Sequence, residues 1–107
     1  MSSLSTHVLD VALGRPARGV PVSLMQEGRL LGGGSTDDDG RLKGFVAGGL
    51  LAPGTYSLRF DTGSYFSAQG RECFYPEVLV TFSVGAEGHY HVPLLLAAYG
   101  YSTYRGS

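Results

Sequence analysis

Apolar and polar residues alternate along several short stretches of the chain, and this period of two predicts β-strands. In residues 4–11 the side chains of Ser5 and His7 share one face, because successive side chains of a strand point to opposite sides. Leu4 and Val8 share the other face. Leu9 lies on the face of Ser5 and His7, and Thr6 on the face of Leu4 and Val8, so both faces of the first predicted strand matter.

The same alternation, interrupted by turn residues, recurs along the rest of the chain. Further strands are predicted at residues 20–25, 42–45, 54–61, 77–84, 89–96 and 101–104. Residues 14–17 break the pattern, and the three glycines at 32–34 predict a turn. Only residues 61–70 favour a short helix. Seven or eight short strands separated by turns predict an all-β sandwich or barrel.

The composition indicates one small folded domain over residues 1–107. The chain has 107 residues, of which 43% are hydrophobic and 16% are charged. A chain of this size buries about two-thirds of the surface that its unfolded form exposes. Disorder is excluded, since the hydrophobic content is high and the net charge is only −1.

The charge balance and the single cysteine limit the partners and the compartment. Eight Lys and Arg residues against nine Asp and Glu leave no basic field for nucleic acid or an anionic membrane. Apolar stretches such as residues 92–98 are too short to span a bilayer, which takes about 18 residues. The chain starts without the features of a signal peptide, and Cys73 has no partner for an intrachain disulfide. We therefore expect a cytoplasmic protein that binds neither nucleic acid nor membrane.

The three histidines are the first candidates for chemistry. His89 and His91 lie two residues apart on a predicted strand, so they share a face, and His7 shares a face of the first strand with Ser5. Imidazole is neutral and basic near pH 7, which suits proton transfer. A His-x-His pair with a third histidine also resembles a zinc site. We regard zinc as the weaker alternative, because no Cys or carboxylate nearby is evident as a fourth ligand. His89 is also close to the turn at Gly88, where its side chain could face solvent.

A loop arginine and the C-terminal segment are the next candidates. Arg41 follows Asp39-Gly40, a pair typical of a tight turn, and loops of a rigid sandwich often carry binding groups. The last nine residues contain three tyrosines. This aromatic content predicts that the C-terminus packs against the protein, so the carboxylate of Ser107 could be buried near other polar groups.

Several segments together resemble one family, the 5-hydroxyisourate hydrolases related to transthyretin. They are residues 5–10 (STHVLD), 14–17 (GRPA), 36–41 (TDDDGR), 74–78 (FYPEV), 89–95 (HYHVPLL) and 101–107 (YSTYRGS). The resemblance covers nearly the whole chain, and the terminal Tyr-Arg-Gly-Ser is its most diagnostic part because it separates the enzyme from the hormone carrier. One departure is Ala97-Ala98, where the family commonly has Ser-Pro.

The resemblance implies a transthyretin-like sandwich of two sheets with one short helix, assembled as a homotetramer that is a dimer of dimers. It implies hydrolytic opening of the six-membered ring of 5-hydroxyisourate, with no metal and no cofactor. Carried over residue by residue, the catalytic positions fall on His7, Arg41, His91 and Ser107. The substrate would be bound by His7, Arg41 and His91, and Tyr104 would help to form the pocket.

The residue types at these positions fit a hydrolysis, although the roles of the two histidines stay open at this level. One of His7 and His91 would activate water, and the other would orient the substrate or protonate the leaving nitrogen. The guanidinium of Arg41 suits the urea-like edge of the substrate and the oxyanion. Ser107 would hold a histidine tautomer through its hydroxyl or its carboxylate.

Two other classes of function compete with the hydrolase. A transthyretin-like carrier would bind a small aromatic or hormone-like ligand in the tetramer channel, but it would favour an apolar channel. A structural sandwich domain would have no site, and it would leave the three histidines and Arg41 scattered.

Overall fold

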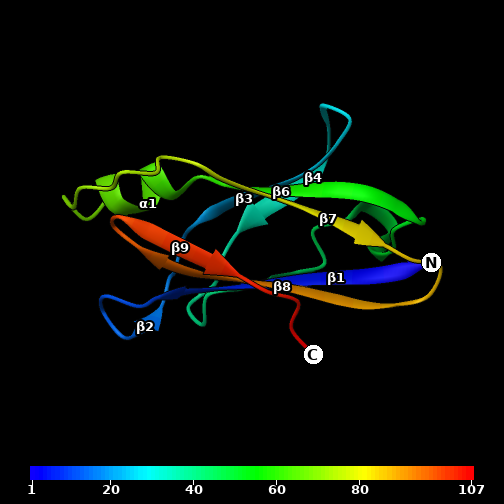
Figure 1. Ribbon diagram of the computed structural model, residues 1–107, viewed down its shortest axis with the longest axis horizontal. Coiled ribbons are helices and arrows are strands. Elements are labelled where there is room, and N and C mark those ends of the chain that lie inside the picture. The colour runs from blue at the N-terminus through cyan, green and yellow to red at the C-terminus, as the bar shows by residue number, and fades with distance from the viewer.

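Two β-sheets pack face to face in the computed structural model, which describes residues 1–107 apart from the side chain of Ala47 (Figure 1). The first sheet has the order β2-β1-β8-β9, and β5 also pairs with β1. The second sheet has the order β4-β3-β6-β7. The strands of the first sheet are β1 (Ser2–Asp10), β2 (Arg15–Pro16), β5 (Arg41–Lys43), β8 (Gly88–Ala97) and β9 (Gly100–Thr103). Those of the second are β3 (Pro21–Gln26), β4 (Arg29–Ser35), β6 (Gly54–Phe60) and β7 (Val78–Val84).

A long parallel ladder between β1 and β8 joins the two ends of the chain. The register runs from Ser2 opposite Gly88 to Asp10 opposite Leu96, so every residue of β1 is paired. The other edge of β1 pairs antiparallel with β2 and with β5, where His7 lies opposite Arg41. The strands of the second sheet and helix α1 (Thr62–Ser67) lie between β1 and β8 in sequence.

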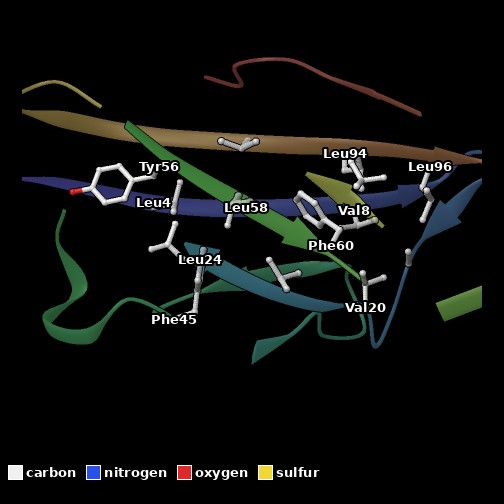
Figure 2. Close-up of a cluster of buried hydrophobic side chains, with 14 of the residues drawn as sticks. Leu4, Val8, Val20, Leu24, Phe45, Tyr56, Leu58, Phe60, Leu94 and Leu96 are labelled. Atoms are coloured by element: carbon white, nitrogen blue, oxygen red, sulfur yellow. The ribbon is translucent and has the colours of Figure 1, made fainter. Parts of the chain in front are cut away.

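The hydrophobic core lies between the two sheets (Figure 2). Val8 of β1 and Leu94 of β8 face Leu24 of β3 and Phe60 of β6, and all four are fully buried. Burying a side chain of this size stabilises the fold by about 1.5–3 kcal/mol. Residues of β1 alternate between buried and half-buried, as the sequence pattern predicts, so Ser5 and His7 face outward from the first sheet.

One sequence-based prediction about a turn is wrong. Residues 32–34 lie inside strand β4 rather than in a turn, because glycine here permits close backbone approach. A Cβ atom on Gly33 would lie 2.7 Å from the carbonyl oxygen of Val22, and one on Gly32 would collide with the carbonyl oxygen of Phe45. The break at 14–17 also contains the short strand β2. The described residues thus form nine strands, against the seven or eight predicted.

The predicted short helix is confirmed as α1, and a 3-10 turn, η1 (Ala47–Gly49), follows β5. Asp61 caps α1, since its carboxylate accepts hydrogen bonds from the backbone N–H of Ser64 (3.1 Å) and its hydroxyl (2.7 Å). Tyr65 and Phe66 of α1 are buried, so the helix closes one end of the sandwich (Figure 1). Among the described residues, no helix has the length and hydrophobicity needed to span a membrane.

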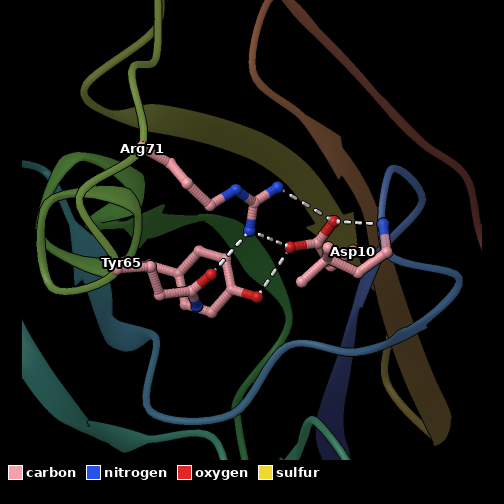
Figure 3. Close-up of polar contacts among 5 residues, drawn as sticks. Asp10, Tyr65 and Arg71 are labelled. Atoms are coloured by element: carbon pink, nitrogen blue, oxygen red, sulfur yellow. Dashed lines mark hydrogen bonds and ion pairs between the residues drawn. The ribbon is translucent and has the colours of Figure 1, made fainter.

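A buried carboxylate links α1 to the end of β1 (Figure 3). Asp10 is fully buried and accepts hydrogen bonds from the hydroxyl of Tyr65 (2.7 Å), from Nη1 of Arg71 (2.7 Å) and from the backbone N–H of Leu13 (3.1 Å). Burial opposes the charged form, but these hydrogen bonds outweigh it and lower the pKa of Asp10 below its usual value. The ionised carboxylate therefore fixes helix and sheet to each other.

Replacing Asp10 by Asn is expected to lower the free energy of unfolding by about 1.5–3 kcal/mol at pH 7, the usual range for hydrogen bonds to a charged group. The matched control is Asp38→Asn, which breaks the exposed ion pair with Arg18 and should have little effect. Urea denaturation of both variants measures the difference. An equal loss of unfolding free energy in the two variants would show that the hydrogen bonds of Asp10 stabilise the fold no more than an exposed ion pair does.

Candidate active site

The outer face of the first sheet brings together three of the residues singled out from the sequence. His7 on β1 lies opposite Arg41 on β5, and His91 is on the neighbouring strand β8, opposite Ser5. The ring centroids of His7 and His91 are 6.5 Å apart, and their planes are tilted by 36°. Two imidazoles and a guanidinium are thus grouped on one half-exposed surface.

A tight turn at residues 37–40 places Arg41. The carboxylate of Asp37 accepts hydrogen bonds from the backbone N–H groups of Asp39 (2.9 Å) and Arg41 (3.0 Å). Gly40 has a φ of 73°, and a Cβ atom there would collide with the carbonyl oxygen of Val8. Its own carbonyl accepts a hydrogen bond from the N–H of Val8 (2.7 Å). The turn is therefore fastened to β1 beside His7.

The same turn sets the tautomer of His7. Its Nε2 atom lies 2.8 Å from the carbonyl oxygen of Asp39. A carbonyl only accepts, so Nε2 carries the hydrogen and donates it. In the neutral ring the lone pair is then on Nδ1, which can accept a hydrogen bond from a ligand N–H.

His91 is held through one ring nitrogen, and its environment favours the neutral form. Its Nδ1 atom lies 2.8 Å from the hydroxyl of Ser5. Partial burial lowers the pKa of His91 below its ordinary value, and the positive charge of Arg41 lowers it further, as do His7 and His89 when they are protonated. In the tautomer in which Nδ1 of His91 donates to the hydroxyl of Ser5, Nε2 carries the lone pair and is available as a base.

His89 and Ser5 extend the cluster in a way that the sequence analysis did not predict. His89 is exposed, as expected, but its Nε2 lies 3.0 Å from the hydroxyl of Ser5 and its Nδ1 lies 2.6 Å from the hydroxyl of Ser3. A pocket of about 290 Å³ beside it is lined by Ser5, Thr6, Arg41, Leu42, Lys43 and His89. The sequence does show that Ser5 shares a strand face with His7, and that His89 shares one with His91. It does not show that these two strands are neighbours, so the contacts of Ser5 with the histidines could not be predicted.

The C-terminal segment crosses β8 at His91. The backbone N–H of Gly106 donates to the carbonyl oxygen of His91 (2.8 Å), and a Cβ atom on Gly106 would lie 2.5 Å from Cδ2 of that ring. Tyr104 and His91 both line a groove of about 260 Å³ that extends to β7. Ser107 follows directly, so the structure brings the end of the chain to the histidine cluster.

The predicted packing of the C-terminus is present, but it does not bury the tyrosines. The ring of Tyr101 packs edge-on against Tyr75, with centroids 5.2 Å apart, and the hydroxyl of Tyr99 donates to Glu72 (3.0 Å). Tyr99, Tyr101 and Tyr104 are nevertheless exposed, and so is Ser107, so within one chain the suggested burial of the terminal residue does not occur.

Comparison with known proteins matches residues 4–106 to the family described as the HIUase/Transthyretin family. The chain belongs to the HIUase/Transthyretin family. A 5-hydroxyisourate hydrolase of Salmonella dublin is 48% identical over 109 residues, covering 97% of this chain and 80% of that protein. The resemblance stated from the sequence is confirmed.

Solved structures agree with this assignment. The 5-hydroxyisourate hydrolase of Klebsiella pneumoniae is 45% identical, with a TM-score of 0.92 and complete coverage of both chains. Sea bream transthyretin, solved in complex with thyroxine, is 29% identical, with a TM-score of 0.87 over 96% of this chain and 93% of that one. The predicted transthyretin-like sandwich is thereby confirmed as the fold of this family member.

The zinc alternative finds no support in this HIUase/Transthyretin family chain. Among the residues that the structure describes, no group of three or more His, Cys, Asp and Glu side chains is placed to hold a metal ion. The ring nitrogens of the histidines form hydrogen bonds to the hydroxyls of Ser3 and Ser5 and to the carbonyl oxygen of Asp39. The cluster instead joins a neutral base to a permanent cation, a combination suited to deprotonating water and stabilising an oxyanion.

Replacing Arg41 by Gln is expected to raise the pKa of His91 toward its ordinary value, because a positive charge that disfavours the imidazolium is removed. Burial still lowers the pKa in the variant, so the rise should be partial. Histidine proton NMR across a pH titration measures it. The control Arg29→Gln removes an exposed arginine from the second sheet and should leave the titration unchanged. An unaltered His91 titration in Arg41→Gln would show that the two groups are not electrostatically coupled.

Proposed function

We propose that this chain is a 5-hydroxyisourate hydrolase, which opens the six-membered ring of its substrate to give 2-oxo-4-hydroxy-4-carboxy-5-ureidoimidazoline. The observation that carries the proposal is the placement of a neutral His91 beside Arg41 and His7 on one outward face. Relatives carrying that name are 44–48% identical over nearly the whole chain. Residues 1–107 would form the single catalytic domain.

His91 is assigned as the base that activates water. When Nδ1 donates to Ser5, the lone pair is on Nε2, and the lowered pKa of His91 keeps the ring neutral near pH 7. Water attacks the ring carbonyl while Nε2 accepts one of its protons. When the carbon–nitrogen bond breaks, the same proton passes from Nε2 to the leaving nitrogen. A positioned base of this kind contributes about 10²- to 10⁴-fold.

Arg41 and His7 are assigned to the substrate and the developing charge. The guanidinium of Arg41 is always positive and presents a planar set of donors, so it can bind the urea-like edge and stabilise the oxyanion. The lone pair on Nδ1 of His7 can accept a substrate N–H, since Nε2–H is committed to Asp39. The reaction adds water and changes no oxidation state, so these residues require no cofactor.

Tyr104 and Ser107 are assigned supporting roles near His91. Tyr104 lines the groove that includes His91, which supports a role in enclosing the substrate. Ser107 lies next to Gly106, whose backbone is bonded to His91. Its hydroxyl or terminal carboxylate would then fix the substrate or an imidazole from the C-terminal side.

The expected result for activity is that the wild-type chain accelerates loss of freshly generated 5-hydroxyisourate, measured by absorbance. His91→Asn and Arg41→Gln should each lower kcat/KM by about 10²- to 10⁴-fold, because each removes a group that acts on the transition state. Arg29→Gln, on the other sheet, is the matched control and should keep the wild-type rate. A rate no higher than the spontaneous one, together with tight binding of an iodinated aromatic ligand, would favour the carrier function instead.

The proposed assembly is a homotetramer built as a dimer of dimers, in the cytoplasm. Support comes from the site, which lies on an open sheet face, and from large exposed side chains: Phe74, Leu79, Tyr99, Tyr101 and Tyr104. The free thiol of Cys73 accords with a reducing compartment.

Light scattering is expected to give four times the chain mass of 11.3 kDa. Leu79→Glu, which puts a charge on an exposed apolar position of β7, should reduce this mass. The control Arg29→Gln should not change it. A monomeric wild-type protein with full activity would show that one chain suffices for the site.

A further inference from the structure

Four side chains on the outer face of the first sheet form an unbroken hydrogen-bonded row. Ser3 and Ser5 come from β1, and His89 and His91 come from β8. The hydroxyl of Ser5 contacts Nδ1 of His91 (2.8 Å) and Nε2 of His89 (3.0 Å), and Nδ1 of His89 contacts the hydroxyl of Ser3 (2.6 Å). The row runs from half-buried His91 to exposed His89, and so from the site to solvent.

The hydrogens in this row can be arranged in two complete ways. In the first, His91 donates from Nδ1 to Ser5, Ser5 donates to Nε2 of His89, and His89 donates from Nδ1 to Ser3. Each bond then has one donor and one acceptor, and Nε2 of His91 has a free lone pair. In the second, every hydrogen bond is reversed, and Nε2 of His91 carries a hydrogen. Conversion between the two moves a proton from one end of the row toward the other.

The proposed hydrolysis needs such a movement, because it releases one proton in each turnover. Water supplies two hydrogens to the reaction. One passes through His91 to the leaving nitrogen, and the other is on the carboxylic acid of the product. That acid ionises at neutral pH, since carboxyl groups have pKa values of about 3–4. The proton would otherwise accumulate beside Arg41 and two imidazoles.

The charges around His91 favour export of this proton over storage. Arg41, His7 and His89 act on His91, and Arg105 lines the same groove as His91. Lys43 lines the pocket beside His89, and the terminal carboxylate of Ser107, next to Gly106, is an anionic group close by in the chain. Each of the side chains Arg41, Lys43, His7, His89 and Arg105 is positive or becomes so on protonation. An additional proton on His91 is therefore disfavoured by partial burial and by Arg41, which favours its release toward solvent.

We propose that Ser5 and His89 form a proton relay for His91. The proton that leaves the carboxylic acid of the product is taken up at Nε2 of His91, and the hydrogen on Nδ1 passes to Ser5. Ser5 passes its own hydrogen to Nε2 of His89, and His89 releases the hydrogen on Nδ1 to water, directly or through Ser3, which then gives up its own hydrogen. The row is then in its second arrangement, and exchange of hydrogens with water returns it to the first. Ser5 is in this sense a positioning residue, since the same hydroxyl holds His91 with Nε2 directed away from it. The relay rests on the proposed hydrolase function.

The test compares kcat at low and high concentrations of imidazole buffer. Ser5→Ala and His89→Gln are expected to lower kcat about 10-fold in dilute buffer, less than loss of the base itself. KM should change little. Added imidazole should restore the rate, because a mobile base can take over proton export. Ser5→Thr retains a hydroxyl and should keep the wild-type rate.

A matched control is Ser57→Ala, which removes a hydroxyl bonded to Thr81 (2.8 Å) on the outer face of the second sheet. It should leave kcat and its buffer dependence unchanged. Nitrogen-15 NMR supplies a readout without substrate: in Ser5→Ala the hydrogen of neutral His91 should move from Nδ1 toward Nε2. Wild-type kcat in Ser5→Ala and His89→Gln at low buffer overturns the relay alone. No catalysed hydrolysis by the wild-type chain overturns the proposed function as well.

Discussion

The parallel pairing of β1 with β8 is the constraint on which both the core and the site depend. It aligns Ser2–Asp10 with residues 88–96, segments more than 80 positions apart in sequence. One face of this pair buries Val8 and Leu94 against the second sheet, and the other presents the histidine row. A shift of one residue would exchange the faces of a strand, placing imidazoles in the core. The hydrophobic burial that stabilises the fold therefore also fixes the positions of the candidate catalytic residues.

The turn at residues 37–40 adds the permanent cation to this face. Asp37 and Gly40 hold the turn against β1, which sets His7 through its Nε2 and brings Arg41 next to the two imidazoles. A rigid sheet edge and a fastened turn thus define three positions without help from a mobile loop. Preorganised groups of this kind stabilise developing charge without reorganisation during the reaction.

Two groups make the fold weaker in acid, for different reasons. The pKa of Asp10 is lowered in the folded state, so its stabilising effect is present above the unfolded value and is lost as the pH falls through the folded value. The pKa of His91 is also lowered, so the unfolded chain binds a proton more readily, and stability decreases as the pH falls below about 6.5. Both effects make the fold more stable near neutral pH than in acid, and the lowered pKa keeps His91 neutral there.

Much of this arrangement could be predicted from the sequence, and the remainder could not for physical reasons. Alternation identified the strands and the faces of His7 and His91, and Asp39-Gly40 identified the turn before Arg41. Alternation does not reveal which strands are neighbours, so the row through Ser5 and His89 was not found. Gly33 lies in a strand, where it permits a close backbone approach. In the sequence alone, such a glycine cannot be distinguished from a glycine in a turn. Anchoring of the C-terminus at Gly106 is a backbone contact that aromatic content could not indicate.

A crystal structure with a bound, non-hydrolysable oxidised purine tests the central claim most directly. The account predicts that the ring lies on the outer face of the first sheet, with Arg41 at its urea-like edge and Nε2 of His91 facing the carbonyl carbon. A more open cavity of about 830 Å³ beside α1, lined in part by Arg59, Asp61 and Glu77, is the alternative place for a ligand. Binding there, with the histidine face unoccupied, would contradict the account.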